Sequence, residues 1–138
     1  MKSNKINICC IGAGYVGGPT MAVIAYHCPK IKITIVDKNS KKIKQWNGST
    51  NNLPVKEPGL DKIVEKVRNR NLFFSSDIKK NIEESQMIFI AVNTPTAESG
   101  PAKGMGADLT NVIQTAKEIA KYSKTPKIIV EKLSLIHI

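Results

Sequence analysis

Short apolar runs alternate along the chain with longer segments of helical periodicity. The apolar runs are rich in β-branched residues and flanked by turn residues, which is typical of buried strands in a parallel sheet. Strands are therefore predicted at 6–11, 32–37, 72–75, 87–92 and 127–131. Helices are predicted at 19–28, 40–47, 59–70, 77–84 and 108–122. For the last helix, the expected capping residue is Asp108, and the expected packing face consists of Val112, Ile113, Ala116, Ile119 and Ala120.

Strands that alternate with helices in this way predict a parallel sheet covered on both faces, with right-handed crossovers. The expected strand order is 3-2-1-4-5, the first part of a doubly wound, Rossmann-like α/β fold. The chain of 138 residues has the length of one domain. We assign this domain to residues 1–132, and we interpret 133–138 as an anomalous tail that suggests a truncated or misassembled coding sequence.

The turn after the first predicted strand carries a G-x-G-x-x-G pattern, formed by Gly12, Gly14 and Gly17. The pattern stands between a buried strand and a helix, which is the context that dinucleotide binding requires. The first glycine permits a tight turn, the second leaves room for a pyrophosphate, and the third lets helix and strand approach. Free N–H groups at the helix start would hold the anion. The alternative is a purely structural glycine turn.

Asp37 ends the second predicted strand, 20 residues after Gly17. A carboxylate at this place accepts hydrogen bonds from the hydroxyls of an adenosine ribose and repels a 2′-phosphate, so we expect NAD rather than NADP. Four lysines crowd the following turn and could soften that preference: Lys38, Lys41, Lys42 and Lys44. The alternatives are an ordinary strand-end aspartate and a solvated lysine face.

A polar turn follows the fourth predicted strand and consists of Val92, Asn93, Thr94, Pro95 and Thr96. In the expected order this strand neighbours the first, and ligands of open α/β sheets bind outside the carboxyl ends of the strands at such a switch point. The turn is therefore a second candidate for cofactor contact, the alternative being a plain polar turn.

Composition narrows the class of protein. The three cysteines lack zinc-finger spacing and cannot all pair, so we expect free thiols, no metal site and a reducing, cytoplasmic location. No apolar run reaches the ~18 residues of a membrane helix, and the apolar stretch near the N-terminus is too short for a signal peptide. The net charge of +10 permits nucleic-acid binding, but the basic residues are spread along the chain and only two are arginine, so none is expected.

Several motifs in order resemble the N-terminal part of the UDP-glucose/GDP-mannose dehydrogenase family, in particular its eukaryotic UDP-glucose 6-dehydrogenases. The similar segments are 8–20, 46–47, 57–60, 71–75, 92–96, 107–109 and 131–132. The resemblance implies an NAD-dependent, two-step oxidation of UDP-glucose to UDP-glucuronate in a full-length parent that is a homo-oligomer. The NAD-contacting positions that it implies are Gly12, Ala13, Gly14, Tyr15, Val16, Gly17, Asp37, Lys42, Val92, Asn93, Thr94, Pro95 and Thr96.

The sequence also departs from the family pattern at several points. The family's catalytic cysteine and sugar-nucleotide pocket lie in later segments, and none of Cys9, Cys10 and Cys28 matches that cysteine. Lys56 stands where animal members have tyrosine, and the sequence after Lys132 leaves the family pattern. We therefore expect the 138-residue chain alone to be inactive. Two alternatives stay open: a sibling enzyme acting on GDP-mannose or UDP-N-acetylmannosamine, and a non-catalytic NAD-sensing domain.

Overall fold

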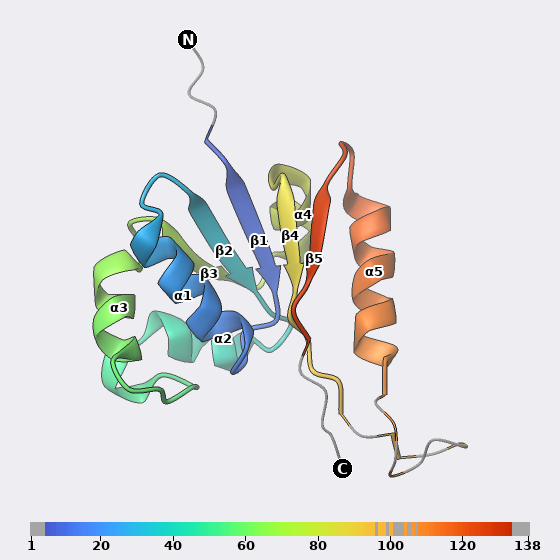
Figure 1. The fold of residues 1–138 in the computed structure, drawn as a ribbon, viewed down its shortest axis with the longest axis horizontal. Helices are drawn as coiled ribbons and strands as arrows, with labels where there is room; N and C mark the ends of the chain where they lie inside the picture. Colours follow the sequence, from blue (N-terminus) through green and yellow to red (C-terminus); the bar gives the residue numbers. More distant parts are fainter. Residues whose placement is uncertain are drawn as a thin grey trace.

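The computed structural model describes residues 5–95, 97–98, 100, 104, 106 and 108–133. Its centre is a five-stranded sheet in which every pair of neighbouring strands is parallel. The order β3-β2-β1-β4-β5 is the predicted one (Figure 1). The strands are β1 (Asn7–Ile11), β2 (Lys32–Val36), β3 (Leu72–Ser75), β4 (Met87–Ile90) and β5 (Ile128–Glu131).

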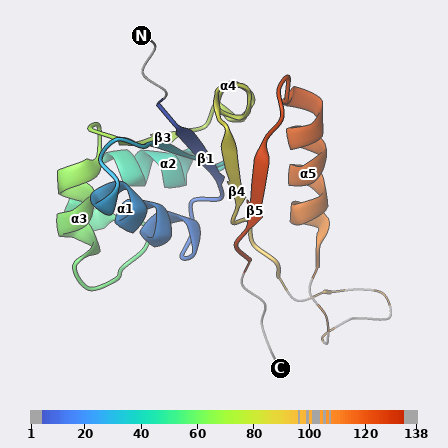
Figure 2. The same cartoon turned by 45° about the horizontal axis from the view of Figure 1, so that its top comes forward.

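Helices cover both faces of this sheet, as expected for a doubly wound fold. They are α1 (Gly17–His27), α2 (Ser40–Asn47), α3 (Leu60–Val67), α4 (Ile78–Glu84) and α5 (Thr110–Tyr122), with a 3₁₀ turn, η1 (Thr50–Asn52). The first three helices gather beside β1, β2 and β3, whereas α5 lies on the outer side of β5 (Figure 2). The fold class predicted from the sequence is therefore confirmed.

The two faces have separate hydrophobic cores. One core joins the sheet to α1, α2 and α3, and the other joins it to α4 and α5. Cys10 belongs to the first core and Cys9 to the second, because successive side chains of a strand point to opposite faces. Both are fully buried free thiols, so they act as small apolar residues.

Helix α3 is shorter than predicted, because it ends at Val67 rather than at residue 70. Arg68 leaves helical geometry, and Asn69 adopts a left-handed conformation with φ of 62°. The Arg68 guanidinium donates from Nη1 to the carbonyl oxygens of Trp46 (2.9 Å) and Gly48 (2.6 Å) at the end of α2. The end of α3 therefore coincides with a tertiary contact between α3 and the end of α2. The hydrophobic periodicity of the sequence does not reveal such a contact.

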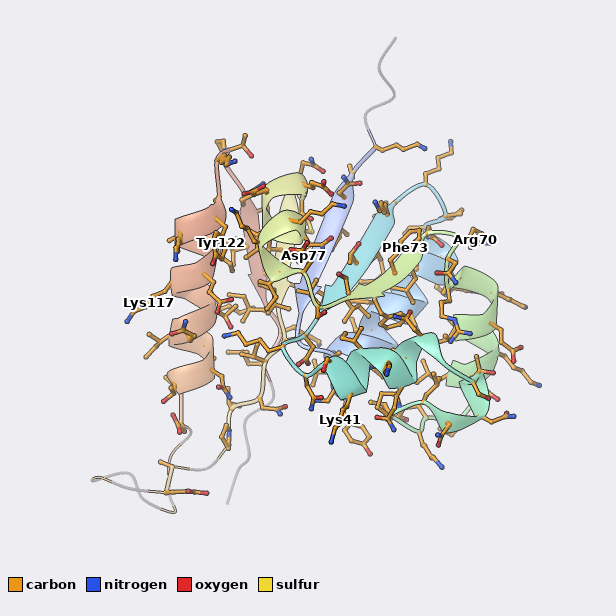
Figure 3. All side chains as sticks on the ribbon, turned by 180° about the vertical axis from the view of Figure 1, so that it is seen from behind. Lys41, Arg70, Phe73, Asp77, Lys117 and Tyr122 are labelled. Carbon is orange, nitrogen blue, oxygen red and sulfur yellow. The ribbon has the colours of Figure 1, made fainter. Side chains whose placement is uncertain are left out.

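The packing face of α5 differs from the predicted one. Ile113 is 54% exposed, whereas Thr115 and Ile119 are buried. Tyr122 packs against the second core, and Figure 3 shows it on the side of α5 toward α4, with Lys117 on the outer side. The predicted cap also shifts by one residue: Leu109 is the N-cap, and the Asp108 carboxylate accepts from the Thr110 N–H and hydroxyl, which lowers the pKa of Asp108.

Since the strands are parallel, their carboxyl ends meet at one edge of the sheet. The turns after β1, β2 and β4 lie at this edge and are held together by backbone hydrogen bonds: Gly12 N–H donates to Val36 O, and Ala91 N–H donates to Ile11 O, each at 2.8 Å. At the opposite edge the buried Asn71 amide donates to the carbonyl oxygens of Ala25, Cys28 and Ile31. The fold therefore brings three predicted site segments to one edge.

Candidate functional site

The turn after β1 requires glycine for reasons that differ from position to position. Gly12 has a φ of +116°, and a Cβ there would collide with Ala91 O of the turn after β4. A Cβ on Gly17 would collide with Gly12 O, so this glycine lets α1 approach the turn. In contrast, the nearest atom to a Cβ on Gly14 would be Asn93 Oδ1 at 3.9 Å. Gly14 therefore faces open space in which a ligand can sit.

The N-terminus of α1 is available to an anion. The N-cap, Val16, has no side chain that accepts a hydrogen bond from the first turn, and that turn holds no acidic residue. The positive end of the helix dipole is thus not neutralised from within the helix. Together with the open space at Gly14, it makes a cradle that suits a phosphate group.

Asp37 lies directly beside the glycine turn. Its Oδ2 accepts a hydrogen bond from Ala13 N–H, and its Oδ1 accepts one from Asn39 N–H, each at 2.9 Å. The Lys42 Nζ stands 3.9 Å from the same Oδ2. The carboxylate side chain is 17% exposed, so it still reaches solvent. Each oxygen has a second lone pair with which it can accept from a ribose hydroxyl.

The turn after β4 forms the other wall. Val92 packs against the second core, and Thr94 is buried. The turn is tied to the start of α5, because Asn111 Nδ2 donates to Asn93 O (3.0 Å) and Asp108 N–H donates to Pro95 O (2.6 Å). Thr96, the fifth residue of this candidate turn, lies outside the described residues, as do residues 134–138 of the predicted tail.

Two clefts meet at the glycine turn. The first, of about 320 Å³, reaches from Gly12–Gly14 past Asp37 to α4 and α5. The second, of about 470 Å³, lies between Tyr15, Val16 and Pro95 and the segment Pro54–Val55. Both are lined by Ala13, Gly14, Lys42, Ala91, Val92 and Asn93. A two-part ligand joined by a diphosphate at Gly14 would occupy one cleft with each half.

Sequence reasoning missed the contribution of α5 to the first cleft. Four polar residues at helical spacing line it: Asn111, Gln114, Thr115 and Glu118. Glu118 forms an ion pair with Lys38, in the turn after β2, with 2.6 Å between Oε1 and Nζ. The signal was present as the polar stripe i, i+3, i+4, i+7 of this helix, but such a stripe normally indicates a solvated face.

None of the three cysteines reaches these clefts. Burial raises the pKa of Cys9 to about 12 and raises that of Cys10 further still. A thiol is a poor nucleophile when it is not ionised. Cys28 follows α1 and therefore lies at the amino-end edge of the sheet, opposite the glycine turn. Cys10 contacts the glycine turn only from the core side, through Sγ and Gly12 O, so within the described residues no thiol lines either cleft.

The parallel order, the glycine turn beside Asp37 and the paired clefts define a Rossmann-like dinucleotide-binding domain. Residues 6–136 match the model of the "UDP-glucose/GDP-mannose dehydrogenase family, NAD binding domain". The chain therefore belongs to this family and corresponds to its NAD-binding domain.

Relatives of known function agree with this assignment. The chain is 56% identical over 127 residues to the UDP-glucose 6-dehydrogenase of Drosophila melanogaster, and 56% identical over 125 residues to that of Caenorhabditis elegans. These matches cover 92% and 91% of the chain. The chain spans 26% of the length of each relative.

Solved structures show the same architecture. The GDP-mannose dehydrogenase of Pseudomonas aeruginosa superposes with a TM-score of 0.77 at 27% identity, over 94% of this chain and 28% of that one. The UDP-N-acetyl-mannosamine dehydrogenase of Staphylococcus aureus gives 0.74 at 26% identity, over 92% and 28%. In the described part of the chain, no helix has both the length and the apolarity to cross a membrane.

Proposed function

We propose that NAD binds across the two clefts, with its diphosphate at Gly12–Gly17 and its adenosine ribose on Asp37. The nicotinamide half would lie in the second cleft, beside the turn at 92–96. The bound cofactor supplies the hydride acceptor, while the residues of this chain bind and orient it. The observation that carries this proposal is the contact of the Asp37 carboxylate with the glycine turn, at the point where the two clefts meet.

Lys42 contributes a positive charge to this site. Its ammonium group lies 3.9 Å from Asp37 Oδ2 and lines both clefts. There it would contact a phosphate or a ribose hydroxyl of NAD. The same charge, together with Lys38, would reduce the repulsion of a 2′-phosphate by Asp37. We therefore expect a preference for NAD over NADP that is moderate.

We further propose that the full-length parent oxidises UDP-glucose to UDP-glucuronate. The support is the identity of 56% to the UDP-glucose 6-dehydrogenases of Drosophila melanogaster and Caenorhabditis elegans. The resemblance also supports a homo-oligomeric parent, and the free, buried thiols support a reducing location such as the cytoplasm. Assays of the parent with UDP-glucose, GDP-mannose and UDP-N-acetylmannosamine would decide between these substrates.

Calorimetric titration of the purified chain with NAD and NADP tests the cofactor proposal. Saturable binding with NAD tighter than NADP is expected. The absence of any heat at millimolar NAD, on a sample shown to be folded, would refute it. The same preparation mixed with NAD and UDP-glucose should form no NADH, because neither cleft holds a thiol. Measurable NADH would contradict the proposed inactivity of the chain.

A further inference from the structure

A buried tryptophan that lines neither cleft contacts the glycine turn. Trp46, on α2, is fully buried, and its indole Nε1–H donates to Ala13 O at 2.9 Å. Its ring stacks on Phe74 with a centroid distance of 4.9 Å. The same ring fills the space beside Gly18, where an added Cβ would collide with it. Trp46 is therefore held in one orientation and carries one hydrogen bond to the turn.

That bond fixes the direction of a backbone N–H group. The peptide joining Ala13 to Gly14 is planar and trans, so its C=O and N–H point in opposite directions. When Ala13 O points at Trp46, Gly14 N–H points away from it. In the part of the chain that the structure describes, Gly14 N–H has no protein acceptor. Gly14 lines both clefts, so this donor is available to a ligand there.

The other side of Ala13 is held as well. Ala13 N–H donates to Asp37 Oδ2, so a side chain after β2 fixes one peptide and a side chain of α2 fixes the next. Helix α2 is itself anchored, because Arg68 donates to the carbonyl oxygens of Trp46 and Gly48. The orientation of the turn thus depends on a connected set of contacts outside the G-x-G-x-x-G segment.

We propose that Trp46 is a positioning residue for the cofactor diphosphate. Its indole N–H holds the Ala13–Gly14 peptide so that Gly14 N–H is presented to a phosphate oxygen before the ligand arrives. A donor oriented in advance binds an anion without the cost of reorganising the turn. This inference rests on the proposed binding of NAD at the same turn.

The replacement Trp46→Phe keeps an aromatic ring against Phe74 and Gly18 but removes the donor. Affinity for NAD and for ADP-ribose, measured by calorimetry, should fall about tenfold, which equals about 1.4 kcal/mol. Affinity for adenosine, which has no diphosphate, should stay within twofold of the unmodified chain. Two-dimensional ¹H–¹⁵N NMR titration measures that weaker binding, and it also follows the Gly14 amide resonance. This resonance should shift on NAD addition, and less so in the variant.

Two further samples separate this role from simple packing. Trp46 is the single tryptophan of the chain, so its replacement by benzothienylalanine removes the N–H while preserving ring size. It should reproduce the tenfold loss. Val67→Ala, a truncation in the same core but away from both clefts, should lower thermal stability without changing NAD affinity.

Equal NAD affinity in the benzothienylalanine sample and the unmodified chain would overturn the proposal. Equal losses for NAD and adenosine would do so too, since a general distortion of the site would then be responsible. Failure of the unmodified chain to bind NAD would refute the proposed function itself. Normal NAD binding that does not respond to loss of the indole N–H would refute only the role of Trp46.

Discussion

Asp37 Oδ2 accepts a hydrogen bond from Ala13 N–H at 2.9 Å, which joins residues 24 positions apart in sequence. The carboxylate that follows β2 thereby becomes part of the wall of the glycine turn that follows β1. Parallel pairing of these strands brings their carboxyl ends together. The conformation of the glycine turn without a ligand therefore depends on Asp37, the residue proposed to bind the adenosine ribose.

Asp37→Asn tests this link. An amide offers one acceptor oxygen where two N–H groups point at the carboxylate, so the free energy of unfolding should fall by about 1–2 kcal/mol. The affinity for NAD should fall at least tenfold, since hydrogen bonds to a charged acceptor contribute more than neutral ones. The NAD-to-NADP affinity ratio should move toward unity. Calorimetry and thermal unfolding measure both effects, and an unchanged ratio would contradict the assignment of Asp37.

Gly14→Ala should impair NAD binding, whereas Gly17→Ala should impair folding stability. A methyl group on Gly14 meets open space, so this variant should fold with a melting temperature close to that of the unmodified chain. It should nevertheless bind NAD at least tenfold more weakly, because the methyl group occupies the space proposed for the diphosphate. A methyl group on Gly17 collides with Gly12 O, and this variant should be destabilised by several kcal/mol. Normal NAD binding by Gly14→Ala would place the diphosphate elsewhere.

The buried thiols predict a specific response to alkali. Burial raises the pKa of Cys9 to about 12 from its ordinary value of 9.0, so the folded state retains a proton that the unfolded state loses above pH 9.0. Stability from this source is complete below pH 9.0 and declines as the pH rises toward about 12. Denaturant titrations across this range should show the decline.

The same burial predicts which cysteine is modified. In the folded chain at neutral pH, iodoacetamide should label Cys28 and leave Cys9 and Cys10 unmodified, whereas all three should react in denaturant. Mass spectrometry counts the adducts. Labelling of Cys9 or Cys10 in the folded state, at a rate similar to that of Cys28, would show that the hydrophobic cores around β1 open readily.

The outer strand β5 is expected to promote self-association of the chain. Ile128 and Ile129 are 59% and 43% exposed, and β5 is the terminal strand of the sheet. Exposed, β-branched edge strands are templates for pairing between chains. Ile128→Lys should therefore reduce concentration-dependent light scattering while preserving NAD affinity, because Ile128 lines neither cleft. Equal scattering by the variant and the unmodified chain would exclude this edge as the source.

The sequence by itself determined the features that depend on local pattern. Apolar runs and helical periodicity specify the alternation of strands and helices, and chain connectivity then restricts the parallel order. The three glycines and Asp37 could be assigned positions at one edge because the carboxyl ends of neighbouring parallel strands meet there. Each of these inferences needs only residues that are close in sequence or related by a general rule of topology.

Only the tertiary structure decided which surfaces meet. The apolar residues of α5 suggested a packing face, yet Ile113 is exposed and the polar stripe with Thr115 and Glu118 faces the first cleft. Trp46 lies on the helix predicted at 40–47, but its hydrogen bond to Ala13 O depends on how α2 packs against the glycine turn. Such contacts join residues far apart in the chain, and their geometry follows from the packing of whole elements, which no local periodicity encodes.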